Sequence, residues 1–172
     1  MGRPQYFQYY DSPLGKILLV ATDYGLSGAW FEGQKYYAEN FNTEAQRAKS
    51  EYVGLAEEWL DAYFQGMEPD FQVPIDLSGT PFRVAVWEEL YKVPWGESVS
   101  YGLLGARVAM RLKRSYSLTR PTAQAVAHNP VSIIVPCHRV LGRNGELTGY
   151  AGGLERKRFL LRLERIHFDP TS

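Results

Sequence analysis

The first third of the chain alternates between short apolar runs and turn residues. Residues 16–21 are rich in Ile, Leu and Val, an Asp-Tyr-Gly turn occupies residues 23–25, and residues 26–31 resume the apolar pattern. Two such runs around a short turn are typical of an antiparallel hairpin. In residues 50–66 the apolar positions recur at helical spacing up to a glycine, so this stretch is predicted to be a helix.

The second half predicts helices. Thr80 and Pro81 have the features of a helix start, and apolar residues follow them at intervals of three or four. Residues 100–110 and 117–130 predict two further short helices, and Pro121 is tolerated in the first turn of the second one. The apolar run at residues 131–136 predicts a short buried strand. Residues 154–164 predict a final amphipathic helix.

A stretch with little periodicity separates the two patterns. Residues 67–81 contain three prolines and read as a linker. We therefore predict an α+β protein with two domains. Residues 1–78 form a small α/β supporting domain built on an antiparallel sheet. Residues 79–172 form a helical domain in which two short helices and a buried strand fit a helix-turn-helix or winged-helix module.

The charge distribution changes at about the same place. The net charge is zero, but residues 1–82 carry 5 Lys/Arg against 12 Asp/Glu, and residues 83–172 carry 14 against 7. Opposite charge on the two halves favours a polyanion such as nucleic acid as the partner of the second half. The alternative is a chance distribution over a solvated surface.

Composition excludes several classes of protein. One cysteine cannot form an internal disulfide or a Cys-rich zinc site. The apolar runs are too short to cross a bilayer, and residues 1–20 lack the apolar core of a signal peptide. We expect a reduced, cytoplasmic protein that does not enter a membrane.

The only cysteine has unusual neighbours. Cys137 is followed by His138 and Arg139. A free thiol has a pKa of about 8.5, so a nearby imidazole that takes its proton would activate it. Adjacent side chains diverge, so we expect a water between the two groups, and Glu164 is a candidate to hold the imidazole. The alternative is an inert core cysteine beside a core histidine.

The sequence around this cysteine resembles a known family. The motif Pro-Cys-His-Arg-Val at residues 136–140 is similar to the active-site signature of the O6-alkylguanine-DNA alkyltransferases, also called methylated-DNA–protein-cysteine methyltransferases. The likeness extends over residues 129–164, 79–104 and 11–21, which together make up 73 of the 172 residues.

The resemblance implies a fold and an activity. The N-terminal domain would be ribonuclease-H-like, and the second domain would bind double-stranded DNA through a helix-turn-helix. The activity would be DNA repair by direct reversal. An alkyl group would pass from O6-alkylguanine, with O4-alkylthymine as a further candidate, to Cys137 after the nucleotide is flipped out of the helix. Each monomer would act once, with no cofactor and no metal.

The resemblance also implies roles for single residues. His138 and Glu164, with water, would deprotonate Cys137, Tyr101 would donate to the departing base, and Asn129 would tie the recognition helix to the active-site loop. Arg120 would enter the DNA helix, although a phosphate contact or a solvated charge is the alternative. The remaining implied residues fall into two groups. Those facing DNA, besides Arg120 and Tyr101, are Thr122, Ala123 and Ala127, and those forming the base pocket are Val140, Tyr150, Ala151 and Gly152.

The chain departs from the family pattern in three places. Residues 106–119 form a longer segment than expected, whose four basic residues are predicted to extend the DNA contact. Pro121 directly follows Arg120, which affects the start of the helix, and Ala151 stands where a serine is frequent. Two other functions remain as alternatives, namely a non-enzymatic sensor of alkylated DNA that recruits repair factors, and a cysteine hydrolase that turns over.

Overall fold

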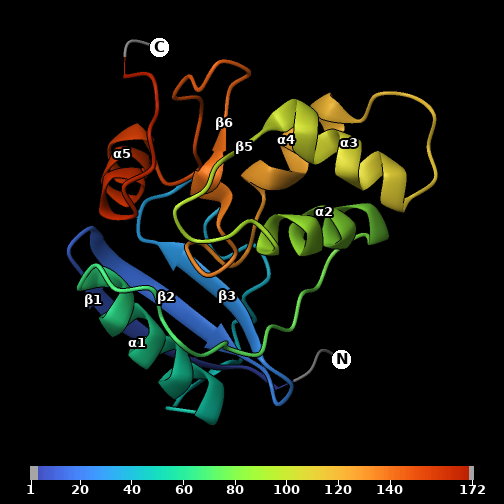
Figure 1. Ribbon diagram of the computed structural model, residues 1–172. Helices are drawn as coiled ribbons and strands as arrows, with labels where there is room; N and C mark the ends of the chain where they lie inside the picture. The colour runs from blue at the N-terminus through green and yellow to red at the C-terminus, as the bar shows by residue number, and fades with distance from the viewer. Residues whose placement is uncertain (1–3, 171–172) are drawn as a thin grey trace. The chain divides into compact units, whose positions relative to one another are not determined.

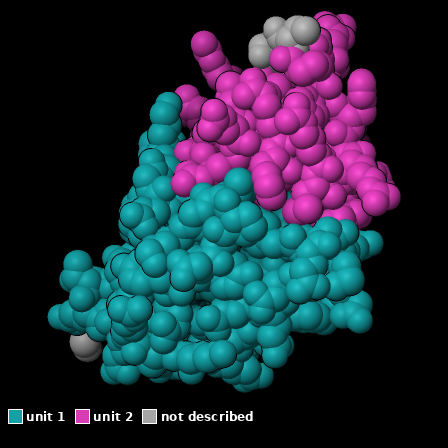
Figure 2. Space-filling view, turned by 90° about the vertical axis from the view of Figure 1, so that its left-hand side faces the viewer, with its two compact units in different colours: residues 1–78, 130–132 teal, residues 79–129, 133–172 magenta. Residues whose placement is uncertain are grey.

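The chain folds into two compact units. The computed structural model describes residues 4–170, and its elements are shown in Figure 1. Unit 1 comprises residues 1–78 and 130–132, and unit 2 comprises residues 79–129 and 133–172, as coloured in Figure 2. The division after residue 78 lies inside the Pro-containing stretch. The inclusion of residues 130–132 in unit 1 had no signal in the sequence.

Unit 1 is built on a four-stranded sheet. The strands are β1 (Tyr6–Ser12), β2 (Gly15–Ala21), β3 (Leu26–Phe31) and β4 (Gln46–Arg47), in the order β3-β2-β1-β4. β1, β2 and β3 pair antiparallel, and the short β4 runs parallel to β1. The predicted hairpin is confirmed, because β2 pairs with β3 through Leu19 and Ala29. β1 was missed, since its Tyr-rich sequence stays partly exposed and shows no apolar alternation.

A single long helix packs on this sheet. Helix α1 (Glu51–Phe64) confirms the prediction for residues 50–66. It begins where the Ser50 hydroxyl accepts a hydrogen bond from the backbone N–H of Val53, and it ends at Gly66, whose φ of 83° suits glycine. Its buried side faces the strands. The fully buried residues on that side are Val53, Ala56, Leu60 and Tyr63.

Unit 2 is mainly helical, which confirms the predicted α+β class. Helices α2 (Pro81–Tyr91), α3 (Tyr101–Arg111) and α4 (Thr119–Ala127) pack against one another. Thr80 caps α2 as predicted, with Pro81 in its first turn. The Trp87 indole Nε1 donates to the Ala125 carbonyl over 2.8 Å, which fixes α2 against α4. α3 and α4 are joined by residues 112–118.

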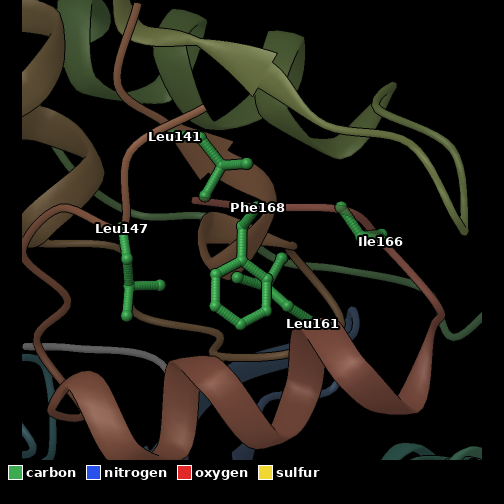
Figure 3. Close-up of a cluster of buried hydrophobic side chains, with 5 residues drawn as sticks. All are labelled: Leu141, Leu147, Leu161, Ile166 and Phe168. Carbon is green, nitrogen blue, oxygen red and sulfur yellow. The ribbon is translucent and has the colours of Figure 1, made fainter. Parts of the chain in front are cut away.

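The rest of unit 2 supports the cysteine. A two-stranded parallel sheet pairs β5 (Val99–Ser100) with β6 (Val140–Leu141), and a short 3₁₀ helix, η1 (Cys137–Arg139), leads into β6. Helix α5 (Leu154–Leu163) lies beside them. Figure 3 shows the apolar cluster that holds α5 in place. Its members are Leu141, Leu147, Leu161, Ile166 and Phe168.

The predicted strand at residues 131–136 is wrong. These residues are buried, but they form turns, and Ile133 has a φ of 70°. Only Val131 makes an isolated bridge, to Ala29 within unit 1. The chain turns back on itself because the Val135 carbonyl accepts hydrogen bonds from Asn129 and from the backbone of Cys137. A short apolar run cannot be distinguished from such a buried turn by periodicity alone.

Candidate active site

Cys137 begins the 3₁₀ helix η1 and is almost completely buried, with 5% of its surface exposed. Its backbone N–H donates to the Val135 carbonyl over 2.9 Å, and Asn129 Nδ2 donates to the same carbonyl over 2.8 Å. Asn129 follows the end of α4, so this bond links that helix to the turn before the cysteine. The thiol is therefore held on a backbone that has little freedom to move.

The surroundings of the thiol act on its pKa in opposite directions. Burial raises the pKa of Cys137, and this effect outweighs the Asn129 side chain, the Lys157 ammonium and the Tyr150 hydroxyl, which all lower it. The resting group is consequently the neutral thiol. A nucleophilic reaction at this sulfur requires a base that removes the proton.

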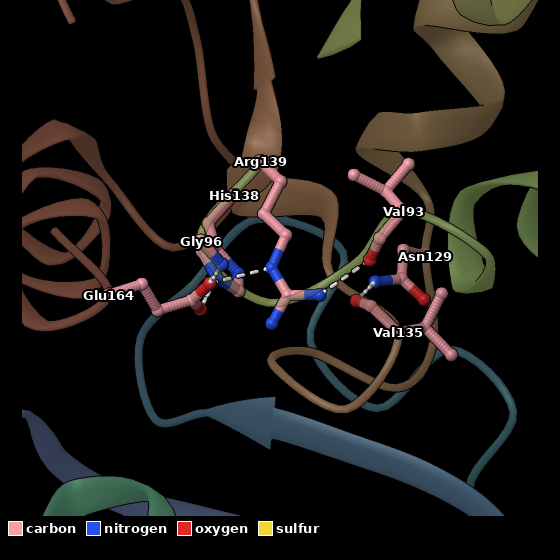
Figure 4. A network of polar contacts seen from close by, with 7 residues as sticks. All are labelled: Val93, Gly96, Asn129, Val135, His138, Arg139 and Glu164. Carbon is pink, nitrogen blue, oxygen red and sulfur yellow. Dashed lines mark hydrogen bonds and ion pairs between the residues drawn. The ribbon is translucent and has the colours of Figure 1, made fainter. Parts of the chain in front are cut away.

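A buried network lies next to the cysteine in sequence and is drawn in Figure 4. His138 Nε2 lies 2.5 Å from Glu164 Oε2, and both side chains are fully buried. Glu164 Oε1 accepts a hydrogen bond from Arg139 Nε over 2.8 Å and one from the backbone N–H of Gly96 over 3.2 Å. Arg139 also donates to the Val93 carbonyl over 2.7 Å. Arg139 thus forms an ion pair with a carboxylate 25 residues further along the chain.

The protonation of this network follows from its contacts. Burial alone would raise the pKa of Glu164, but hydrogen bonds from His138 and Arg139, together with the charge of Arg139, hold it at about 2. Burial lowers the pKa of His138. A carboxylate only accepts, so the neutral imidazole carries its hydrogen on Nε2 and donates it to Glu164. The lone pair of the ring is then on Nδ1, which is also buried.

Lys157 is a site residue that the sequence analysis missed. Its side chain on α5 is completely buried, and Nζ donates to the carbonyls of Val140 over 2.7 Å and Thr148 over 3.1 Å. Burial lowers its pKa to about 8, and the nearby Cys137 acts in the opposite sense. A signal was present, because Lys157 precedes Leu160 and Leu161 by three and four residues and so shares their buried side.

Two tyrosines lie near the thiol. The Tyr101 hydroxyl lies 3.3 Å from Thr148 Oγ1 and 3.4 Å from the Gly149 carbonyl, and burial raises its pKa. The Tyr150 hydroxyl is buried, and burial together with the Cys137 sulfur raises its pKa well above the ordinary value. Both phenols are therefore protonated, and both can donate a hydrogen bond near the sulfur.

The residues expected to form the base pocket lie on β6 and in the segment that precedes α5. Val140 is fully buried and Gly152 is buried, whereas Tyr150 and Ala151 are partly exposed. Residues 148–153, here called the 148–153 loop, carry three of these four residues. Lys157 ties the start of this loop to β6 through its bonds to Thr148 and Val140. Of these residues, Tyr150 lies close enough to Cys137 for each group to shift the pKa of the other.

The residues expected to face DNA lie on α4, with one exception. Arg120 is exposed in the first turn of α4, so Pro121 does not displace it from the helix, and Ala123 and Ala127 are partly exposed. Thr122 is a correction. Its side chain is fully buried, because it points to the interior of unit 2, so it cannot offer its hydroxyl to DNA.

Two observations concern metals and membranes. Within residues 4–170, no group of three or more His, Cys, Asp or Glu side chains is arranged to hold a metal ion. In the same part of the chain, every helix is too short or too polar to cross a bilayer.

Comparison with known proteins agrees with this geometry. Residues 81–166 match the DNA-binding domain of 6-O-methylguanine DNA methyltransferase, and residues 5–77 match its ribonuclease-like domain. The methylated-DNA–protein-cysteine methyltransferase of Mycolicibacterium paratuberculosis is 39% identical over 167 residues, which cover 96% of this chain and 95% of the relative. The Haemophilus influenzae protein of the same name is 36% identical and covers 95% and 88%.

Solved structures show the same relationship. The crystal structure of Mycobacterium tuberculosis OGT in complex with DNA matches this chain with a TM-score of 0.80 at 36% identity, covering 93% of this chain and 92% of that one. Both halves of the sequence match one family over nearly their whole length. The chain therefore belongs to the 6-O-methylguanine DNA methyltransferase family.

Proposed function

We propose that this protein repairs DNA by direct reversal, moving an alkyl group from O6 of an alkylated guanine in double-stranded DNA to Cys137. The observation that carries the proposal is the buried thiol beside a buried imidazole–carboxylate pair. This arrangement lies in a chain whose curated relatives are named methylated-DNA–protein-cysteine methyltransferases. The product is a thioether that water does not cleave, so each molecule acts once.

The transfer step balances without a cofactor. The sulfur of Cys137 attacks the alkyl carbon, the new S–C bond forms as the C–O6 bond breaks, and the electron pair goes to the guanine. The thiol proton passes through a water to Nδ1 of His138, whose Nε2 hydrogen is held by Glu164. Glu164 stabilises the imidazolium because its low pKa keeps it charged. This site therefore needs neither a metal nor a redox group.

The departing guanine needs a proton or a strong hydrogen bond. We assign this role to the Tyr101 hydroxyl, which lies beside the 148–153 loop and stays protonated because its pKa is raised. Asn129 contributes by holding the Val135 carbonyl and, through it, the turn before Cys137. It is a positioning residue in this scheme.

The DNA must present the damaged base to Cys137, a residue of which only 5% of the surface is exposed. Base flipping brings the damaged base out of the stack. We assign the filling of the gap that it leaves to Arg120, which is exposed at the start of α4. Ala123 and Ala127 allow the helix to approach the DNA backbone closely. Entry of the base requires the 148–153 loop to yield, and Val140, Tyr150, Ala151 and Gly152 then surround the base.

The setting follows from the chemistry. We propose a monomer that acts in the cytoplasm, where the thiol stays reduced. O4-alkylthymine is a further candidate substrate, because its alkyl group is also carried by an exocyclic oxygen.

Intact-mass measurement tests the function. The protein is incubated with a duplex containing O6-methylguanine, and a single added CH₂ mapped to Cys137 is expected. Cys137→Ala should still bind the duplex and gain no mass, which checks that binding and transfer are separate. A duplex with O4-methylthymine tests the second substrate.

The competing functions give different results in the same experiment. Tight binding without any added mass would indicate a sensor of alkylated DNA. Repeated turnover of an ester or amide with an unmodified Cys137 would indicate a hydrolase. Either result would refute the proposed function.

A further inference from the structure

The turn between α3 and α4 carries positive charge without a counter-charge nearby in sequence. Residues 98–145 contain seven Lys or Arg and no Asp or Glu. Four of the seven lie between residues 107 and 114, at the end of α3 and the start of the 112–118 turn. The sequence alone treats these four residues as equivalent.

The structure sets Arg111 apart from the other three cations. Arg111 is committed to α2, where one terminal nitrogen donates to Glu89 over 3.1 Å and the other bonds Glu88. Lys113 and Arg114 are exposed, and within residues 4–170 neither side chain forms an ion pair or a hydrogen bond. Arg111 thus anchors the end of α3, and Lys113 and Arg114 beyond it keep their charge available.

The backbone holds Lys113 and Arg114 in a defined position. The N–H of Lys113 donates to the Met110 carbonyl over 3.2 Å, and that of Arg114 donates to the Ala109 carbonyl over 2.8 Å. Lys113 has a φ of 56°, a left-handed conformation that is usually adopted by glycine at a helix end. A lysine in this conformation is unfavourable for stability, so a requirement for its charge would explain its presence.

The other end of the turn leads into the recognition helix. The Ser117 hydroxyl accepts a hydrogen bond from the backbone N–H of Thr119 over 3.3 Å, and Leu118 is buried. Arg120 follows at once in the first turn of α4. Between the two anchored ends, Tyr116 is 60% exposed.

We propose that Lys113 and Arg114 bind phosphates of the duplex beside the flipped nucleotide and so extend the DNA contact beyond α4. This inference rests on the proposed function, because it takes α4 as the helix that meets DNA. An ammonium and a guanidinium both suit phosphate oxygens, and contacts to the backbone carry no sequence information. The contact therefore acts on damaged and undamaged duplex alike.

Arg165 provides a matched control. It follows α5 with a φ of 60°, and its N–H donates to the Arg162 carbonyl over 3.0 Å, while that of Ile166 donates to Leu161 over 2.9 Å. It is exposed, like Lys113, and Figure 1 shows α5 on the opposite side of unit 2 from α3 and α4. Lys113→Gly and Arg165→Gly thus remove the same charge and relieve the same backbone strain.

The experiment measures binding to an undamaged duplex at several salt concentrations. Log affinity falls as log salt rises, and Lys113→Gly should make this fall shallower by about 0.9 in slope. Adding Arg114→Ala should make it shallower by about 0.9 again. Arg165→Gly should leave the slope unchanged. Both glycine variants should raise the melting temperature by roughly 2–4 °C, which shows that weaker DNA binding does not come from misfolding.

The outcomes separate this inference from the proposed function. An unchanged slope in Lys113→Gly with Arg114→Ala, or an equal fall in Arg165→Gly, would overturn the phosphate contact. The wild-type protein is tested in parallel for gain of mass from O6-methylguanine duplex. If it binds with the expected slopes but gains no mass, the transfer function fails and the contact stands.

Discussion

Single residues determine the protonation states of the groups in the site. Glu164 accepts hydrogen bonds from His138, Arg139 and Gly96, so it remains a carboxylate in a buried position. That charge fixes the tautomer of His138 and leaves Nδ1 as the basic atom. Removing Glu164 would therefore change both the stability of unit 2 and the ability of His138 to take a proton.

The first prediction concerns stability in acid. The pKa of Glu164 is about 2 in the folded protein and about 4.5 in the unfolded chain. Its contribution is present above pH 4.5 and is lost as the pH falls toward 2, and it amounts to about 3 kcal/mol. The unfolding free energy of each protein is measured by chemical unfolding at pH 7 and near pH 2. Between these two pH values, the unfolding free energy of Glu164→Gln should fall by about 3 kcal/mol less than that of wild type.

An exposed carboxylate on the same helix gives the control. Glu155→Gln lies in the first turn of α5 and should leave the acid dependence of the wild type unchanged. Burial of the neutral His138, whose pKa is lowered, adds loss of stability below pH 6.5 in all three proteins. If Glu164→Gln keeps the full acid dependence of wild type, the ion pair is not the cause.

The second prediction concerns Lys157. Its ammonium lowers the pKa of Cys137, so Lys157→Met should shift the pH–rate profile of alkylation by free O6-alkylguanine base to higher pH. Lys157→Arg keeps the charge and should shift the profile less. A lysine that only held Val140 and Thr148 together would lower the melting temperature in Lys157→Met without moving the profile.

At the scale of elements, the position of α4 depends on one glycine of α3. A Cβ at Gly105 would lie 3.1 Å from the backbone N and Cα of Thr119, the first residue of α4. The helices approach so closely because no side chain separates them. The start of α4, which carries Arg120, is thereby set by the surface of α3.

The third prediction tests this contact. Gly105→Ala should destabilise the protein by about 1–3 kcal/mol, because neither backbone can yield without moving α4. It should slow transfer from duplex DNA more than from the free base, since only the duplex needs Arg120. Gly102→Ala, whose Cβ would have only Ser100 Oγ within reach at 4.0 Å, should instead stabilise α3 by about 0.5–1 kcal/mol. Equal effects of the two substitutions would contradict this view of the contact.

At the scale of the whole molecule, the reaction enlarges the side chain of Cys137 inside a buried segment. All residues from 129 to 141 are buried, and Cys137 lies among them. An alkyl group added to the sulfur must therefore be accommodated among buried residues. The alkylated protein should therefore differ from the unmodified one in stability as well as in chemistry.

The fourth prediction is that alkylation lowers the stability of the protein. An extra alkyl group at Cys137 should cost about 1–3 kcal/mol through overpacking, and a benzyl group should cost more than a methyl group. Calorimetry of the unmodified, methylated and benzylated protein, with adducts verified by mass, measures the effect. A melting temperature that does not change with adduct size would show that the site has room to spare.

The sequence determined those features that depend on neighbours along the chain. Helices α1, α2 and α4 follow from apolar spacing with Ser50, Thr80 and Pro121 at their starts, and the hairpin follows from two apolar runs around a turn. Cys137 and His138 were found because the motif that contains them is local, and Glu164 was found because the resemblance extends to residue 164. A signal that comes from neighbouring residues does not depend on the tertiary structure.

The tertiary structure decided what depends on distant partners. Lys157 is a site residue because its ammonium donates hydrogen bonds to the carbonyls of Val140 and Thr148. The side chain of Thr122 cannot contact DNA because it is buried in the interior of unit 2. Residues 131–136 form turns because Asn129 and Cys137 share the Val135 carbonyl. Tertiary packing determines which residues are buried and which distant groups form hydrogen bonds. The spacing of residues along the sequence does not carry this information.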